Sequence, residues 1–262
     1  MQICDIGDIN LHYREDGDPN GAPIVFANSL GTDLRLWDQV VPLLPAGLRI
    51  IRYDKRGHGL SDATPAPYGM GTLVRDAERL LDALGVKNCV FVGLSIGGLI
   101  AQGLVVKRPD LISGLVLSNT AAKIGTADMY AARVAAVKAG GIEPLAEGIL
   151  ERWFTPAFRA TPEFSAWRNM LIRQPVEGYA GCCAAISGTD FYTTTAALTL
   201  PTMAIVGSED GATPPDLVRE TADLIKRSQF EIIRGAGHLP CVEKPAEYAE
   251  LLTKFLLEIG HV

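Results

Sequence analysis

The sequence has no stretch that is dense in lysine or arginine. It carries 24 Lys and Arg residues against 30 Asp and Glu residues, for a formal net charge of -6. Proteins that bind nucleic acid neutralise many phosphates with clustered basic side chains, so nucleic acid is excluded as an expected partner. With 48% hydrophobic and 21% charged residues, the composition is typical of a globular protein and argues against a disordered chain.

Cysteines are also scarce, and they do not have the spacing of a zinc site. An odd number of cysteines without paired spacing argues against the disulfide framework of a secreted protein. The N-terminal segment MQICDIGDIN lacks the basic and apolar regions of a signal peptide. We therefore expect no bound metal, a cytoplasmic location and reduced thiols for the five cysteines, Cys4, Cys89, Cys182, Cys183 and Cys241.

One charge-free run, residues 89–106, has a length that can mark a membrane span. Glycines interrupt this run repeatedly, and the pair Gly97-Gly98 indicates a turn between two elements. We therefore expect a strand and a helix here, and no membrane as a partner.

Short apolar runs alternate with segments of helical spacing along most of the chain. The first two predicted strands, residues 2–6 and 10–15, have the pattern of an antiparallel hairpin. The runs at residues 23–27 and 48–53 are mostly apolar, which suits strands that are covered on both faces of a mostly parallel sheet. The pattern predicts a doubly wound α/β sheet, with further strands at residues 23–27, 48–53, 90–92, 111–117, 202–206 and 229–233, and helices at 33–41, 71–84, 98–107, 214–227 and 246–259.

The alternation stops after Asn119. From about residue 121 to residue 191 the chain is rich in helix-forming residues and has no convincing strand. We therefore predict one α/β core, residues 1–120 and 193–262, with a helical lid inserted at residues 121–192.

The segment Gly93-Leu94-Ser95-Ile96-Gly97 is a G-x-S-x-G motif between a predicted strand and a predicted helix. In this context the serine sits on a sharp turn that only small neighbours allow, and the following helix directs the positive end of its dipole at developing negative charge. We predict Ser95 as a nucleophile. The alternative is a glycine-rich turn with an incidental serine.

A serine hydroxyl needs a base within hydrogen-bonding reach before it can attack a carbonyl carbon. Of the four histidines, His238 lies just after the last predicted strand, where the chain order serine, acid, histidine places the base. His12 falls in a predicted edge strand, His58 precedes the nucleophile, and His261 is next to the last residue. We predict His238 as the base, with a surface-loop histidine as the alternative.

The acid is expected after the penultimate strand, where Glu209 and Asp210 are neighbours. We prefer Asp210, because it is nearer the glycine of the turn and backbone donors can hold its short side chain; Glu209 stays open. A mere turn-forming role for Asp210 is also open. An acid after the strand at residues 111–117 is excluded, because Ser118 and Asn119 stand there.

Acyl transfer also needs hydrogen-bond donors for the oxyanion of the tetrahedral intermediate. The amide of Ile96, directly after the nucleophile, is one candidate. The other is the amide of Leu30 in the segment Asn28-Ser29-Leu30-Gly31, which follows the predicted strand at residues 23–27. The alternative for this segment is a plain turn.

Five motifs in order resemble the α/β-hydrolase family across essentially the whole chain: ANSLGT, DKRGHGLS, GLSIGG, GSEDGATPP and GAGHLPCVEKP. Within that family the chain is most similar to the 3-oxoadipate enol-lactonases, which have Asn-Ser-Leu-Gly where many relatives have His-Gly-x-Gly. The resemblance implies hydrolysis of a small enol-lactone to 3-oxoadipate in bacterial aromatic catabolism, with no metal or organic cofactor. It implies Ser95 as nucleophile, Asp210 as acid and His238 as base, with the amides of Leu30 and Ile96 as oxyanion donors.

Residues 128–139, at the start of the predicted lid, are mostly small and apolar, and Arg133 is the conspicuous charge among them. An arginine suits bidentate binding of a carboxylate. Our hypothesis is that Arg133, with Trp153 beside it, binds the carboxylate of a small anionic lactone or ester under the lid. The alternative is a solvated helix arginine and a core tryptophan.

The same catalytic residue types fit other functions. An aryl esterase, a cofactor-free perhydrolase or haloperoxidase, and a hydrolase of carbon–carbon bonds would share this triad. A hydrolase-fold receptor that binds a small ligand with slow or absent turnover is an alternative of another class. A dehalogenase or epoxide hydrolase is disfavoured, because those proteins resemble this fold but have Asp in the place of Ser95.

Overall fold

The computed structural model describes all 262 residues. They build one eight-stranded sheet in the order β1-β2-β4-β3-β5-β6-β7-β8. β2 pairs antiparallel with β1 and with β4, and the other neighbouring pairs are parallel. The strands are β1 (Gln2–Asp5), β2 (Asn10–Gly17), β3 (Ala22–Ala27), β4 (Leu48–Tyr53), β5 (Cys89–Leu94), β6 (Ile112–Ser118), β7 (Thr202–Gly207) and β8 (Gln229–Ile233).

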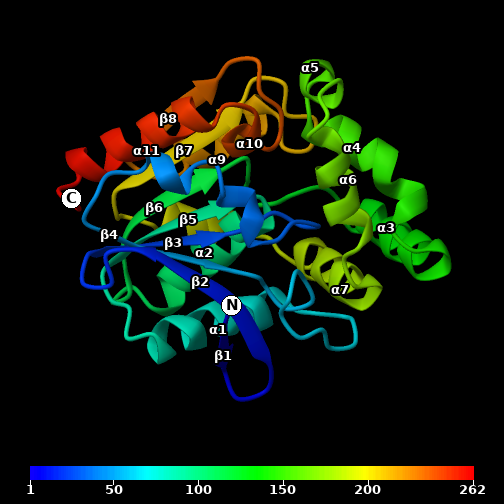
Figure 1. Cartoon of the computed structure of the whole chain (residues 1–262), viewed down its shortest axis with the longest axis horizontal. Helices are drawn as coiled ribbons and strands as arrows, with labels where there is room; N and C mark the ends of the chain where they lie inside the picture. The colour runs from blue at the N-terminus through cyan, green and yellow to red at the C-terminus, as the bar shows by residue number, and fades with distance from the viewer.

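Helices cover both faces of the sheet, which explains why the central strands are apolar throughout. β5 and β7 are buried along their whole length. α1 and α2 pack together on one face, and α11 lies on the other with two short 3-10 helices, η1 and η2 (Figure 1). The predicted doubly wound, mostly parallel sheet is therefore confirmed. Its helices are α1 (Met70–Ala83), α2 (Ile96–Lys107), α9 (Pro215–Asp223), α10 (Pro240–Glu243) and α11 (Pro245–Glu258), with η1 at Leu34–Trp37 and η2 at Val41–Leu43.

Between β6 and β7 the chain forms helices and no strand. These helices gather at one end of the sheet, to the right in Figure 1, and α3 packs along α7. α8 then leads the chain back to the core beside α2. The helices of this region are α3 (Ala127–Gly140), η3 (Glu143–Leu145), α4 (Ala146–Trp153), α5 (Pro156–Arg159), α6 (Phe164–Ile172), α7 (Val176–Ser187) and α8 (Tyr192–Ala196).

The helix predicted at residues 33–41 is wrong, because this segment forms η1, a turn and then η2. Asp33 caps η1 by accepting a hydrogen bond from the Arg35 amide. Trp37 is pulled into the core, where its indole N–H donates to the Asn28 side chain at 2.8 Å. Pro42 has no N–H to donate to a longer helix. These contacts favour tight turns over a continuous α-helix.

Two smaller differences concern placement. His12 is not on an edge strand, because β1 pairs along the outer side of β2. The helix predicted at residues 214–227 ends at Asp223, and the chain then turns to Arg227, whose φ is 64°. The charge-free run at residues 89–106 is divided between β5 and α2, which confirms the predicted strand and helix. None of the helices combines the length and the apolar character needed to cross a membrane.

Candidate active site

Ser95 lies on a sharp turn between β5 and α2. Its backbone has φ 58° and ψ -116°, which residues other than glycine seldom adopt. Close packing accounts for the flanking glycines. A Cβ atom at Gly93 would lie 2.3 Å from the carbonyl oxygen of Gly97, and a Cβ atom at Gly97 would lie 2.2 Å from that of Ala27. The turn therefore holds the Ser95 side chain at the carboxyl edge of the sheet, where α2 begins.

His238 and Asp210 form a buried pair on the loops that follow β8 and β7. The Nδ1 atom of His238 lies 3.0 and 2.9 Å from the two carboxylate oxygens of Asp210. Thr213 donates to the same carboxylate from its amide at 2.9 Å and from its hydroxyl at 2.8 Å. Glu209, the alternative acid, is exposed to solvent. The structure thus places Asp210, and not Glu209, against the imidazole.

Asn119 also belongs to this group, although it was not predicted. Its Nδ2 atom donates to the Asp210 carboxylate at 2.8 Å. Burial opposes ionisation of Asp210, but the His238 imidazole and the donors around the carboxylate outweigh burial, so the pKa of Asp210 lies below its ordinary value. From the sequence, Asn119 was used only as a reason to exclude a catalytic acid after the strand at residues 111–117. Its place directly after a strand, at the same sheet edge, is the signal that could have assigned it.

Ser95 and His238 line one cavity of about 100 Å³ between the sheet edge and the helices α3, α4 and α7. The Ser95 hydroxyl and the imidazole do not hydrogen bond to one another in this structure. Hydrogen bonds of this kind often become short only when a substrate is bound. The structure therefore brings the predicted serine and histidine to one space, with the contact from His238 to Asp210 already formed.

The two predicted oxyanion donors lie beside Ser95. Leu30 lines the cavity, and Ile96 is the first residue of α2. Neither backbone amide donates a hydrogen bond to an acceptor of the protein. The Ile96 amide is among the unpaired N–H groups at the start of a helix, where the dipole favours negative charge. Both amides are free to donate to a bound oxyanion.

Both predicted lid residues, Arg133 and Trp153, line the same cavity. The guanidinium carbon of Arg133 lies 5.3 Å from the centre of the Tyr130 ring. Trp153 is buried, and its ring lies against Gly31, where a Cβ atom would approach the indole to 3.1 Å. Trp153 is thus packed between α4 and the loop after β3, and it also lines the cavity.

A second arginine, Arg152, lines the cavity, whereas no acidic residue does. Burial and the nearby charge of Arg133 lower the pKa of Arg152. Ser29 and Tyr179 also line the cavity, and their hydroxyl groups are buried without a hydrogen-bond partner. Two cations and two free hydroxyls suit an anionic ligand. Arg152 was missed because an arginine in a helix that also carries glutamates is typical of a solvated face.

The C-terminal end of α4 is attached directly to the loop that carries the imidazole. The backbone amide of His238 donates to the carbonyl oxygen of Trp153 at 2.8 Å. Next to this contact, the Thr155 hydroxyl donates to the Glu243 carboxylate at 2.6 Å. These contacts hold the C-terminal end of α4 against the loop of His238.

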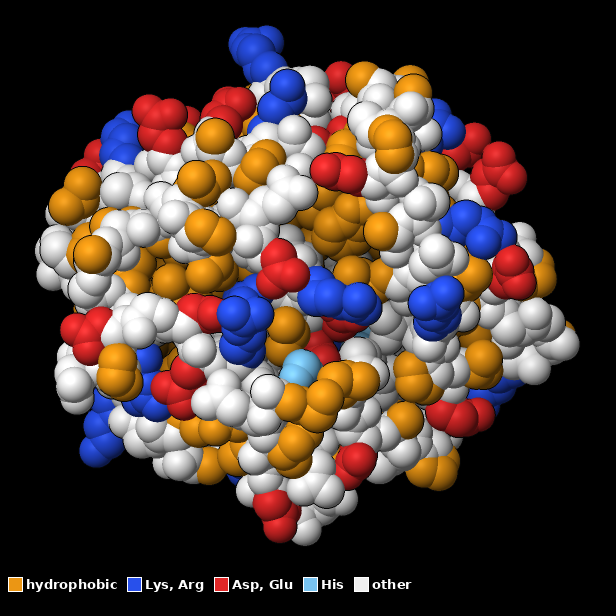
Figure 2. All heavy atoms as spheres, in the orientation of Figure 1, with side chains coloured by type: hydrophobic (Ala, Val, Ile, Leu, Met, Phe, Trp, Pro, Cys, Tyr) orange, Lys and Arg blue, Asp and Glu red, His pale blue; other side chains and the backbone are white.

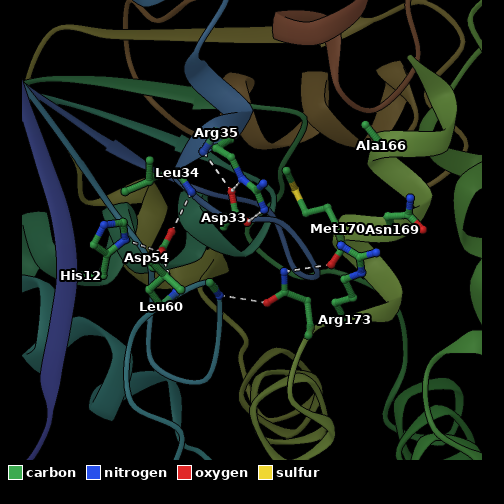
Figure 3. A pocket seen from close by; sticks show the side chains of 12 residues that line it. His12, Asp33, Leu34, Arg35, Asp54, Leu60, Ala166, Asn169, Met170 and Arg173 are labelled. Carbon is green, nitrogen blue, oxygen red and sulfur yellow. Dashed lines mark hydrogen bonds and ion pairs between the residues drawn. The ribbon is translucent and has the colours of Figure 1, made fainter. Parts of the chain in front are cut away.

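The face of the molecule in Figure 2 is hollowed near its centre, where basic and acidic side chains lie close together. A second cavity, of about 490 Å³, adjoins the segment that follows Leu30 (Figure 3). Its carboxylates already have partners, because Asp33 pairs with Arg35 and Asp54 with His12. No group of three or more His, Cys, Asp or Glu side chains in the structure is arranged to hold a metal ion.

Comparison with known proteins places this geometry in a family. The model described as "Alpha/beta hydrolase family" matches residues 24–251. The 3-oxoadipate enol-lactonase 2 of Acinetobacter baylyi is 34% identical over 243 residues, covering 92% of this chain and 91% of that protein. The crystal structure of the enol-lactonase from Burkholderia xenovorans has a TM-score of 0.94 at 33% identity, covering 98% of this chain and 100% of that one. A thermophilic esterase from Thermogutta terrifontis, solved with malate bound, has a TM-score of 0.91 at 29% identity, covering 97% and 95%. The chain belongs to the α/β hydrolase family.

Proposed function

We propose that this protein is a serine hydrolase that opens a small lactone bearing a carboxylate, with 3-oxoadipate enol-lactone as its substrate. The observation that carries the proposal is the composition of one cavity. It joins Ser95 and His238 to two arginines, Arg133 and Arg152, and contains no acidic side chain. A neutral ester would leave both half-buried arginines without a counter-charge, whereas a carboxylate would pair with them.

In the proposed mechanism, the Ser95 oxygen attacks the lactone carbonyl carbon while His238 accepts the hydroxyl proton. Asp210 holds the imidazole by its Nδ1 atom, so that Nε2 is the atom that takes the proton, and it stabilises the imidazolium. The oxyanion accepts hydrogen bonds from the amides of Leu30 and Ile96.

Collapse of this intermediate breaks the bond between the carbonyl carbon and the ring oxygen. The leaving oxygen takes the proton from His238 and becomes an enol, which stays attached to the acyl chain on Ser95 and tautomerises to a ketone. His238 then removes a proton from water, which attacks the ester carbon. The products are the free acid and the regenerated serine, so one water is consumed per lactone.

The comparisons support this substrate class. The Acinetobacter baylyi relative and the Burkholderia xenovorans structure are both described as enol-lactonases. The structure of the related esterase from Thermogutta terrifontis holds malate, which is a dicarboxylate. We also propose that residues 121–192 act as the lid and that the protein works in the cytoplasm on small molecules, which agrees with its five free cysteines.

The direct test is turnover of enzymatically generated enol-lactone, followed by loss of its absorbance. We expect kcat/KM for the lactone to exceed that for a panel of neutral aryl esters. Peracid-dependent bromination is measured on the same preparation. Efficient bromination or aryl-ester hydrolysis with no lactone opening would contradict the proposed substrate and favour a perhydrolase or an esterase.

Substitution of the cavity arginines tests the anion site. We expect Arg133→Ala and Arg152→Ala each to raise KM for the lactone by about 10-fold to 100-fold, because each removes a charge-assisted hydrogen bond. KM for a neutral aryl ester should change far less. The matched control is Arg168→Ala, because Arg168 is a lid arginine that pairs with Glu143 outside the cavity. If Arg133→Ala raised KM equally for the lactone and for the neutral ester, the proposed role of Arg133 in binding the substrate carboxylate would be contradicted.

A further inference from the structure

A buried lysine lies beneath the segment that carries Leu30. Lys55 follows β4, and only 2% of its surface is exposed. Its ammonium group donates to the carbonyl oxygen of Ser29 at 2.6 Å and to that of Thr32 at 3.3 Å. It forms no salt bridge with a carboxylate. A buried cation without an ion partner is costly, so the two carbonyl groups are the contacts that hold this charge.

The Ser29 carbonyl belongs to the same peptide group as the Leu30 amide, which we propose as an oxyanion donor. In a trans peptide the C=O and N–H bonds point in opposite directions. The oxygen is directed into the core at Lys55, so the Leu30 N–H is directed away from it, on the side of the cavity that Ser29 and Leu30 line. A cation bound to the oxygen draws electron density from the peptide and makes its N–H a stronger donor, because hydrogen bonds in a chain polarise one another.

We propose that Lys55 strengthens the oxyanion hole through the Ser29–Leu30 peptide bond, so that its positive charge stabilises the transition state without contact to the substrate. This inference rests on the proposed hydrolase function. Lys55 is thus a positioning and polarising residue behind the oxyanion donor.

Neighbouring contacts hold the segment that carries Leu30 in place, so the Ser29–Leu30 peptide keeps its position against Lys55. The amide of Gly31 donates to the Nε2 atom of His58 at 3.0 Å. The amide of Leu34 donates to the Asp54 carboxylate at 2.7 Å, as the dashed line in Figure 3 marks. Burial and the Lys55 charge keep the pKa of His58 well below its ordinary value, so its imidazole is a neutral acceptor. Among these anchors, Lys55 is the one that supplies positive charge.

The charge on Lys55 can be titrated in an accessible pH range. Burial lowers its pKa to about 8, and the charged or titratable groups that face it are Asp33, Asp54, His58 and Cys182 of α7. The Cys182 thiol stays protonated in this range, because burial raises its pKa to about 12. We therefore expect kcat to fall as pH rises through about 8.

Stability should change in the opposite direction. The folded-state pKa of Lys55 lies below its ordinary value of 10.5, so between about 8 and 10.5 the unfolded chain binds more protons than the folded one. In this window the Lys55 contribution to the free energy of unfolding rises with pH. A fall in kcat through pH 8 would therefore not arise from a loss of stability at Lys55.

The experiment measures kcat and KM on both sides of pH 8 for wild type, Lys55→Met and Lys55→Gln, with p-nitrophenyl acetate as substrate. Lys254→Met, an exposed lysine on α11, is the matched control. At pH 7 we expect kcat of Lys55→Met to be lower by about 10-fold or more, with KM nearly unchanged, because weakening an oxyanion donor acts on the transition state. The fall in kcat above pH 8 should be absent from this variant. Lys55→Gln keeps a donor without charge and should restore little of kcat.

Three outcomes would overturn the role of Lys55. They are a Met variant that keeps both kcat and the fall above pH 8, full rescue by Gln, or a wild-type kcat that does not decline through pH 8. The wild-type pH profile needs no variant, so it tests the role of Lys55 even if Lys55→Met fails to fold. Failure of the wild type to hydrolyse any ester or lactone would overturn the proposed function, and the role of Lys55 with it.

Discussion

A Ser95→Ala variant is expected to keep its fold and to open the enol-lactone with kcat lower by about 10⁴-fold or more. Without the hydroxyl no acyl-enzyme can form, and water must attack the carbonyl carbon directly. The Ser95 side chain has no hydrogen-bond partner in the structure, so its removal leaves no buried group unsatisfied. Steady-state rates and the Tm measure both parts of this expectation.

Ser113→Ala is the matched control, because the Ser113 hydroxyl donates to the Asn88 carbonyl at 2.8 Å, away from the cavity. This variant should turn over the lactone like the wild type. A fluorophosphonate probe should label the wild type at Ser95 and leave Ser95→Ala unlabelled. A Ser95→Ala kcat within about 10-fold of wild type would contradict the nucleophile role. Slow or absent labelling of the wild type, together with tight ligand binding, would favour a receptor.

An Asp210→Asn variant is expected to lower kcat by about 10⁴-fold at neutral pH. The carboxylate contacts the Nδ1 atom of His238 and accepts hydrogen bonds from Thr213 and Asn119. An amide in its place presents an N–H to the imidazole and favours the tautomer that cannot take the Ser95 proton. It also removes the charge that stabilises the imidazolium.

Glu209→Gln, at the exposed neighbouring position, is the control for this charge and should leave kcat nearly unchanged. Circular dichroism of both variants checks that the fold is retained. If Glu209→Gln lost activity and Asp210→Asn kept it, the assignment of the acid would be reversed.

The same pair of variants also predicts how acid affects stability. The folded-state pKa of Asp210 lies below its ordinary value of 3.8, so the unfolded chain binds more protons near that pH. The Asp210 contribution to stability is therefore present above about pH 3.8 and is lost as pH falls through the folded-state pKa. Urea unfolding of wild type and Asp210→Asn across this range should give a stability difference that shrinks on acidification. A constant difference would contradict the lowered pKa.

Much of the fold follows from local sequence pattern. The run at residues 202–206 lies within β7 (Thr202–Gly207), and Ser95 stands between β5 and α2 where its motif placed it. Strands that are covered on both faces must be apolar along their whole length, so they can be recognised without knowledge of their neighbours. The helix predicted at residues 33–41 was wrong because the conformation of this segment depends on partners that are distant in the sequence. One of them is Asp54, whose carboxylate accepts a hydrogen bond from the Leu34 amide.

The sequence alone determined the fold class and the chain order of the serine, acid and histidine loops, because apolar periodicity and turn residues are local properties. Tertiary structure alone decided that Asp210 and not Glu209 meets His238, that Arg152 joins Arg133 in the cavity, and that Lys55 lies under the Ser29–Leu30 peptide. These contacts depend on how separate βα loops and the lid pack at one sheet edge. The direction in which a side chain points and the extent of its burial at such a junction depend on the assembled fold, so a local sequence pattern does not determine them.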